Sequence, residues 1–223
     1  MIIASKRLES VFNMADKAKS IGDIGCDHGY ISYALLESGR VERVITTDIS
    51  APSLEKAKTL LSESFDSERF SLRVGDGFSP IAEGEVDAAI IAGMGGHLIA
   101  GILEDAGKKL DALEYLIVQP MQGAEDLFEY LNAHAFQLLA SDLVEERGKY
   151  YPVLKVKKGG ECTVDWEHFT RFDLFLPMAE RELGRLRGVE KAVETSGKRE
   201  LIDRAREDVR RWEGYLEQYR NCR

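Results

Sequence analysis

The chain has 223 residues, of which 44% are hydrophobic and 31% charged, with a formal net charge of −9. This length suits one α/β domain with a small additional unit. No apolar run approaches the roughly 20 residues that cross a bilayer, the amino terminus lacks the pattern of a signal peptide, and the three cysteines form no CxxC pair. We therefore expect a cytoplasmic protein without a membrane segment, a disulfide framework or a metal site.

The net negative charge argues against indiscriminate nucleic-acid binding, but phosphate contacts depend on local potential and not on the total. The charge is uneven, because residues 178–223 hold 12 Lys and Arg against 10 Asp and Glu. A nucleic-acid partner therefore stays open, provided that local basic patches form.

Apolar spacing predicts a first helix over residues 5–19, followed by strands and helices in alternation. The predicted strands are residues 20–25, 40–50, 70–78, 86–96 and 114–121, and the predicted helices are residues 30–39, 51–64, 97–110 and 124–135. Residues 136–159 read as an antiparallel hairpin that turns at Gly148. Strands that alternate with helices of this length indicate parallel βαβ units, and hence an α/β fold with a Rossmann-like, doubly wound sheet.

The sequence changes character after residue 160. Residues 177–194 and 198–220 are charged and favour helices, and the second carries a narrow apolar stripe of Leu201, Ile202, Ala205, Val209, Trp212 and Leu216. Two antiparallel helices in an α-helical hairpin or coiled coil are the expected structure, although a solvated tail packed on the first domain has the same composition. We therefore predict a cofactor-binding domain at residues 1–160 and a helical domain at residues 161–223.

Acids and glycines gather where the predicted parallel strands end. Strand 20–25 leads into the sequence DIGCDHG, and later strands end at Asp48, at Asp76-Gly77, within AGMGG and at Gln119-Pro120. Ligands of doubly wound sheets bind at this carboxyl edge. Crowded carboxylates repel one another, so a purely structural sheet has little reason to place three acids there.

These residues favour S-adenosylmethionine over NAD, which similar loops also bind. Gly25 and Gly29 allow close approach of a ligand, and Asp48 follows at the distance from which an acid holds ribose hydroxyls. Asp23 would repel a pyrophosphate but suits an ammonium group, and Asp76 suits an adenine amino group. The expected cofactor-binding residues are Asp23, Gly25, Cys26, Asp27, His28, Asp48, Ile49, Asp76, Gly77, Gly93, Met94 and Gly95. Among these, we expect Cys26 to fill the loop and not to act as a nucleophile.

The sequences SKRLESV, DIGCDHGY, GDGF, AGMGGHLI and VQPMQGAEDL, in this order, resemble the bacterial tRNA (adenine-22, N1)-methyltransferase family. The resemblance covers residues 5 to about 158 and continues more loosely into the tail, where that family carries a helical coiled-coil domain. It implies a class I methyltransferase that binds tRNA, as a monomer or weak dimer. The chain departs from the family at Met121, where Gln-Pro-Asn is usual, and at Gly29, where alanine is common.

The target that the resemblance implies is N1 of adenine, on the edge that base pairing covers. The base must therefore be unpaired or extruded into a pocket. Asp27 and His28 are the nearest titratable candidates for handling a proton, and Tyr30 is placed to stack on the base or to border it. Equally simple structural roles exist, since His28 is also placed to cap a helix and Tyr30 to pack in its first turn.

Substrate contacts are expected from Gln119, Pro120 and Met121, and from Arg7. Arg7 and Lys6, together with the tail residues Arg204, Arg206, Arg210 and Arg211, are candidates for tRNA phosphates, although such charges usually form a solvated face. Two rival functions remain: a methyltransferase of a small molecule or protein, and a non-catalytic module that binds S-adenosylmethionine. An NAD-dependent reductase is the weaker third.

Overall fold

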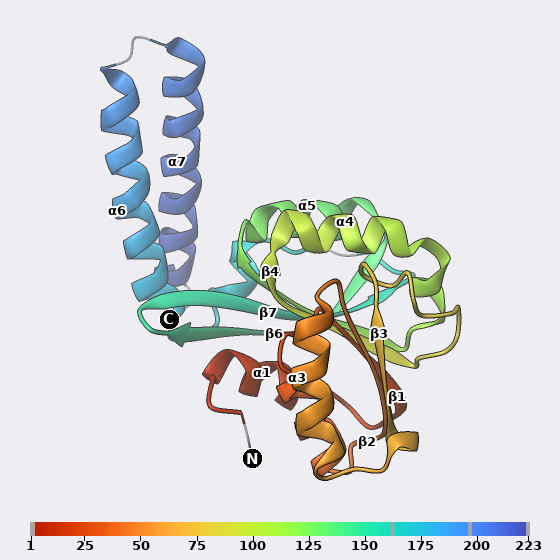
Figure 1. The fold of residues 1–223 in the computed structure, drawn as a ribbon. Coiled ribbons are helices and arrows are strands. Elements are labelled where there is room, and N and C mark those ends of the chain that lie inside the picture. The colour runs from red at the N-terminus through yellow and green to blue at the C-terminus, as the bar shows by residue number, and fades with distance from the viewer. Residues whose placement is uncertain (1–2, 162, 196–197, 222–223) are drawn as a thin grey trace. The chain divides into compact units, whose positions relative to one another are not determined.

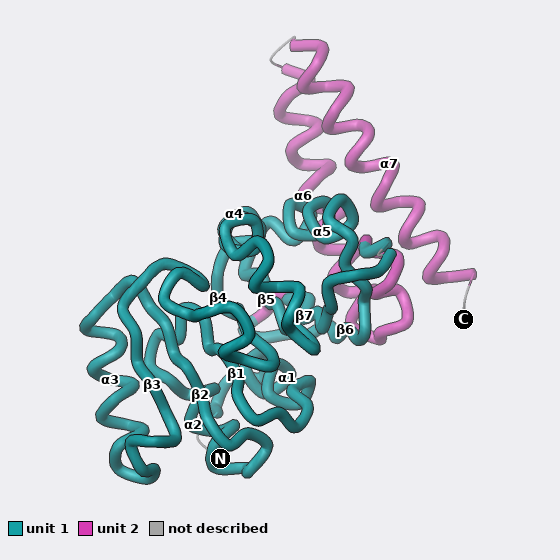
Figure 2. The backbone as a smooth tube through the Cα atoms, turned by 90° about the vertical axis from the view of Figure 1, so that its right-hand side faces the viewer, with its two compact units in different colours: residues 1–147, 151–164 teal, residues 148–150, 165–223 magenta. Residues whose placement is uncertain are grey.

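The computed structural model describes residues 3–161, 163–195 and 198–221. Cys162 and Cys222 lie outside the described residues. The chain forms two compact units, one of residues 1–147 and 151–164 and the other of residues 148–150 and 165–223 (Figure 2).

The first unit is built on one seven-stranded sheet in the order β3-β2-β1-β4-β5-β7-β6 (Figure 1). The pairs among β1 to β5 are parallel, whereas β7 runs antiparallel to β5. The strands are β1 (Ala18–Ile24), β2 (Val41–Asp48), β3 (Phe70–Val74), β4 (Ala88–Gly95), β5 (Tyr115–Gln122), β6 (Phe136–Glu146) and β7 (Lys149–Lys158). The predicted Rossmann-like sheet is confirmed, and so is the closing hairpin.

Helices cover the sheet in two groups. One group has α1 (Lys6–Met14) in contact with α2 (Tyr30–Glu37), and α2 in contact with α3 (Ala51–Ser62). In the other, α4 (Gly96–Ala106) packs on α5 (Ala124–Ala133), as Figure 1 shows. Between these layers, β4 and β5 are buried on both faces. Ile90, Ile91, Ile117 and Val118 have no exposed surface, as expected for central parallel strands.

The first helix is shorter than predicted. It ends at Met14, and Ala18 and Lys19 already belong to β1. Arg40 explains the early stop, because its guanidinium donates to the carbonyl oxygens of Phe12 (2.5 Å) and Ala15 (3.1 Å). These carbonyls are thereby satisfied without further helical turns.

Two predicted elements end early. The predicted strand 70–78 stops at Val74, three residues before Gly77, which adopts a left-handed φ of 50°. The predicted helix 97–110 stops at Ala106, where Gly107 (φ 53°) begins a short 3₁₀ helix, Gly107–Ala112. The predicted turn at Gly148 is confirmed, with Arg147 and Gly148 both left-handed as a two-residue hairpin turn requires.

The second unit consists of a 3₁₀ turn (Trp166–Phe169) and the helices α6 (Phe175–Glu194) and α7 (Arg199–Asn221), which pack on each other. Its core is aromatic, with rings of Trp166, Phe169, Phe175, Trp212 and Tyr219 in mutual contact. The stripe from Ala205 to Leu216 is buried as predicted, but Leu201 is 45% exposed, since it lies in the first turn of α7. No described helix is long and apolar enough to cross a membrane.

Candidate active site

The carboxyl ends of β1 and β4 are neighbours in the sheet, and the strand order reverses between them. The loop after β1 is fastened to β2, because the backbone N–H groups of Gly25 and Cys26 both donate to the carbonyl oxygen of Thr47 (2.7 and 3.2 Å). Ligands of doubly wound sheets bind at this point, outside the carboxyl ends of the two strands between which the order reverses.

The loop after β1 has an unusual backbone. Gly25, Asp27 and Gly29 all have positive φ angles, of 71°, 52° and 75°. Asp is among the few side chains that tolerate this region. Gly29 is also sterically required, because a Cβ there would lie 2.8 Å from Cβ of Ala57 on α3. Alanine, which is common at this position in the family that the sequence resembles, would need α3 to move.

Asp48 connects this loop to the end of β2. One carboxylate oxygen accepts from the Asp27 backbone N–H (3.2 Å) and the other from that of Ser50 (2.7 Å). A carboxylate has about four acceptor positions, so two remain for ligand hydroxyls. The next side chain, Ile49, is 74% exposed, which is unusual for isoleucine and leaves an apolar surface beside the acid.

Asp76 and Gly77 lie beyond the end of β3, next to Asp48. The backbone N–H of Gly75 donates to the carbonyl oxygen of Asp48 (3.0 Å), and Oγ1 of Thr47 donates to that of Gly77 (3.0 Å). The Asp76 side chain is exposed. Hydroxyl acceptors, an apolar side chain and an exposed acid therefore share one edge of the sheet, and this set of groups fits an adenosyl moiety.

Asp23 lies beneath the loop. It is buried, and its carboxylate accepts a hydrogen bond from Oγ of Ser32 (2.6 Å), which in turn lies 2.9 Å from Oγ1 of Thr46. Burial raises the pKa of Asp23 to about 6, against the opposing effect of the Ser32 hydrogen bond. Asp23 therefore joins β1 to α2, and its contact with a ligand ammonium group stays a prediction.

Cys26 is unsuited to nucleophilic chemistry. Burial raises the pKa of its thiol, and the carboxylates of Asp23, Asp48 and Asp27 raise it further. The thiol therefore stays protonated at neutral pH, in agreement with the expected role as a loop filler.

Asp27, His28 and Tyr30 lie together at the mouth of the loop. Nδ1 of His28 is 2.9 Å from Oδ1 of Asp27, and the rings of His28 and Tyr30 are parallel, with centroids 5.6 Å apart. On the other side of the imidazole, Nε2 lies 3.3 Å from Nζ of Lys56 on α3. Sequence reasoning missed Lys56, because nothing local to residues 51–64 shows that this helix faces the loop.

A bulge shapes the end of β4. The pairing of β4 with β5 shifts at Ala92, Met94 and Gly95, and Gly93 has a φ of 85°. Such irregularities redirect side chains near active sites. Here the bulge sends Met94 back over the loop after β1, since a Cβ built on Gly25 would lie 1.8 Å from Cε of Met94.

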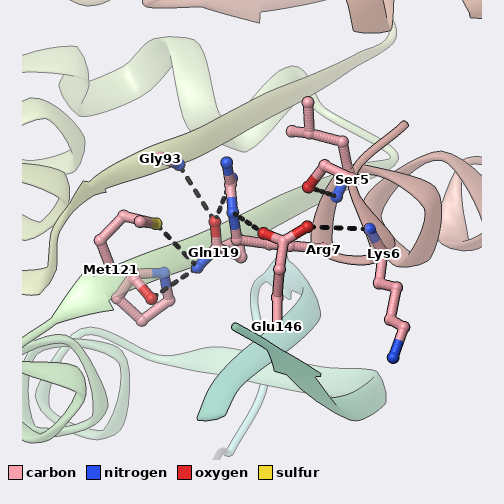
Figure 3. A network of polar contacts seen from close by, with 9 residues as sticks. Ser5, Lys6, Arg7, Gly93, Gln119, Met121 and Glu146 are labelled. Carbon is pink, nitrogen blue, oxygen red and sulfur yellow. Dashed lines mark hydrogen bonds and ion pairs between the residues drawn. The ribbon is translucent and has the colours of Figure 1, made fainter. Parts of the chain in front are cut away.

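Gln119 of β5 holds this bulge. It is fully buried, and its Oε1 accepts both from the backbone N–H of Gly93 (3.2 Å) and from Nη1 of Arg7 (2.7 Å), as Figure 3 shows. Its amide nitrogen donates to the carbonyl oxygen of Pro120 (2.6 Å) and approaches Sδ of Met121 (4.0 Å). Met121 itself is exposed.

Arg7 is found inside the site and not on an outer basic face. Its side chain is 14% exposed, with Nε 3.9 Å from Oε2 of Glu146. Burial lowers the pKa of Arg7, whereas the charge of Glu146 opposes the shift. A contact between Arg7 and a tRNA phosphate stays a prediction, and Lys6 beside it is exposed.

The tail arginines are partly engaged within the second unit. Arg204, Arg206, Arg210 and Arg211 are all exposed, and among them Arg206 pairs with Glu190 and Glu194 and Arg211 pairs with Asp208. Within residues 3–161, 163–195 and 198–221, no cluster of three or more His, Cys, Asp or Glu side chains is arranged to hold a metal ion.

Comparison with known proteins identifies relatives along most of the chain. Residues 4–154 match the family model described as "Methyltransferase domain". The tRNA (adenine(22)-N(1))-methyltransferase of Bacillus subtilis is 37% identical over 155 residues. The match covers 70% of this chain and 65% of that relative's length, just under two thirds.

Two solved structures extend the likeness into the helical unit. The B. subtilis m1A22 tRNA methyltransferase TrmK is 28% identical with a TM-score of 0.82, and the match covers 99% of both chains. Streptococcus pneumoniae Sp1610 in complex with S-adenosyl-L-methionine is 30% identical with a TM-score of 0.78, over 91% of this chain and 99% of that one.

Proposed function

Because this chain belongs to the TrmK-like family of class I methyltransferases, we propose that it methylates N1 of adenine 22 in tRNA with S-adenosylmethionine. The observation that carries the proposal is the hydrogen bond from the loop after β1 to Asp48, beside exposed Ile49. A carboxylate with open acceptor positions, an exposed apolar side chain and a glycine loop lie together here, which supports the proposal. The relatives that share this fold include one solved with the same cofactor.

The cofactor supplies an electrophilic methyl group on a sulfonium. When the cofactor is bound, the carboxylate of Asp48 would accept from its ribose hydroxyls, Ile49 would pack on its adenine ring, and Asp76 would accept from the adenine amino group. Gly25 and Gly77 give the backbone room at the two ends of this binding edge. Asp23, Cys26, Gly93 and Gly95 complete the wall of the site without contributing a nucleophile.

The chain's task in the transfer is alignment. The lone pair of adenine N1 attacks the methyl group directly, so the protein must hold the two in line and keep water out. The residues proposed to contact the entering base are His28 and Tyr30, whose rings are parallel, together with Pro120 and Met121 at the end of β5. Methylation leaves a cationic base, and the Asp27–His28 pair accepts the proton that its exocyclic amine then loses.

The tRNA is too large for the site alone. The residues proposed to hold it are the exposed Lys6 on the first unit and Arg204 on the helical unit, where the family carries a coiled coil. Residues 1–160 would thus bind the cofactor and residues 161–223 the body of the tRNA. The protein would work as a monomer or weak dimer in the cytoplasm, where its substrate is present.

The direct test is methyl transfer from labelled S-adenosylmethionine to unmodified bacterial tRNA, followed by nucleoside mapping. We expect 1-methyladenosine at position 22, and none in a tRNA with guanine at that position. Binding of the cofactor without transfer to any tRNA would refute the proposal, and would favour a methyltransferase of another substrate or a binding module.

A further inference from the structure

Helix α1 enters the site through a single side chain. Arg7 donates from Nη1 to Gln119, and its guanidinium lies beside Gly93, where a Cβ would be 3.7 Å from the same nitrogen. Glu146 of β6 lies on the other side of Arg7, and it also accepts from the Lys6 backbone N–H (3.1 Å; Figure 3). Arg7 thus joins three elements that are far apart in sequence.

The amide of Gln119 is fixed by these contacts. Its oxygen has two donors and its nitrogen donates to the adjacent Pro120 carbonyl, so a flip would place like groups against one another on both sides. Because the amide is fully buried, each hydrogen bond that a flip breaks would leave a buried polar group unpaired, which is unfavourable in free energy. Gly93 and Pro120 select this orientation, and Arg7 adds a third, charged hydrogen bond that strengthens it.

That orientation has a consequence at the end of β4. The Gly93 N–H bonded to Gln119 lies in the middle of the bulge, one residue before Met94. The Met94 methyl rests against Gly25, in the loop proposed to hold the cofactor. A shift of the Gly93 backbone is therefore passed directly to the side chain that separates the loop from the β4 end of the crevice.

We propose that Arg7 is a positioning residue for methyl transfer: through Gln119 it fixes the β4 bulge and holds Met94 against Gly25. This inference rests on the proposed function for its catalytic consequence, but the contact chain itself stands without it. It assigns Arg7 a role in alignment and not in binding tRNA phosphates. A misplacement of about 1 Å at a reacting centre costs on the order of 100-fold in rate.

The contact chain can be tested without any ligand by methyl NMR. The chain has five methionines, and methyl-¹³C labelling with a Met94→Leu reference assigns the Met94 signal. We expect Arg7→Gln, whose side chain is two atoms too short, and Gln119→Leu to shift or broaden that signal. The control is Arg40→Gln. Arg40 anchors the other end of α1 through Phe12 and Ala15, and it is not one of the residues that link Arg7 to Met94.

Kinetics then separate alignment from binding. We expect Arg7→Gln to lower kcat about 10- to 100-fold, while the Kd values for S-adenosylmethionine and tRNA change less than about threefold. If the two residues act in series, the double variant will lose no more than Gln119→Leu alone. Arg40→Gln should keep kcat within about twofold at a temperature where it is folded.

Two results would overturn the inference. The first is a Met94 signal that is unchanged in Arg7→Gln, or changed equally in Arg40→Gln. The second is a weakened tRNA Kd with a reduced salt dependence and normal kcat, which would make Arg7 a phosphate contact. An altered Met94 signal in a protein whose wild type methylates no tRNA would instead refute the proposed function and leave the contact chain confirmed.

Discussion

Nζ of Lys56 lies 3.3 Å from Nε2 of His28. An ammonium group only donates, so Nε2 accepts and the ring proton sits on Nδ1, where it is donated to Asp27. We expect ¹⁵N NMR of the imidazole at pH 8 to show the Nδ1-protonated tautomer of His28. Lys56→Met should shift the population toward the other tautomer, whereas Lys58→Met on the same helix should not. A dominant Nε2-protonated form in the wild type would contradict this geometry.

Ile49 provides a test of the adenosyl site that is separate from stability. Ile49→Ser should weaken S-adenosylmethionine binding about 5- to 10-fold, because covering part of an isoleucine is worth about 1 kcal/mol. Its melting temperature should stay close to that of the wild type, since the side chain is exposed. Isothermal titration calorimetry measures the affinity. Leu139→Ser, an exposed apolar position on β6, is the matched control and should bind the cofactor normally.

The raised pKa of Asp23 predicts that the folded protein loses stability as the pH rises. Its pKa is about 6 in the folded protein against 3.8 as the ordinary value. The folded state therefore binds the extra proton between these values, and stability is lost from about pH 4 to pH 6. The shift corresponds to about 3 kcal/mol as an order of magnitude. Urea unfolding across this range should show the fall in the wild type and not in Asp23→Asn.

The same variant tests the ammonium contact predicted for Asp23. If the ionised carboxylate holds the cofactor's ammonium group, Asp23→Asn will be more stable than the wild type at pH 7.5 but will bind S-adenosylmethionine about tenfold more weakly. Unchanged affinity would restrict Asp23 to its hydrogen bond with Ser32.

A variant at Trp212 tests whether residues 1–160 bind the cofactor independently of the helical unit that is proposed to bind tRNA. Truncation of this buried aromatic side chain by Trp212→Ala should destabilise the helix pair by about 3 to 5 kcal/mol. We expect weaker tRNA binding with unchanged cofactor affinity, measured by filter binding and calorimetry. Leu201→Ala on the same helix should be nearly neutral because Leu201 is exposed. Loss of cofactor affinity in Trp212→Ala would contradict the division of tasks.

The sequence predicted the elements well where one periodicity dominates. The sequences of β4 and β5 are apolar on both faces, and glycine or proline marks the turns. The order of strands and helices could therefore be predicted from the sequence. Element ends were less accurate. Helix α1 stops early because of Arg40, which is 28 residues from Phe12, and no local pattern contains such a contact.

For the candidate site, the sequence indicated which residues lie at strand ends but not which residues contact one another. The position of each residue at a strand end follows from the parallel sheet, but Lys56 beside His28 and Arg7 beside Gln119 depend on how helices pack. Arg7 is 112 residues from Gln119. A charged residue on a short amphipathic helix normally faces water, but the buried oxygen of Gln119 and the carboxylate of Glu146 favour the inward orientation of Arg7.

The contacts of α1 also have a consequence for the order in which the protein folds during its synthesis on the ribosome. Residues of this helix bond to Gln119 of β5 and to Asp142 and Glu146 of β6. Synthesis proceeds at roughly 5 to 20 residues per second, so the first helix emerges many seconds before its last partners. A nascent chain shorter than about 146 residues therefore lacks the partners that hold α1 in the candidate site, however well its early strands have paired.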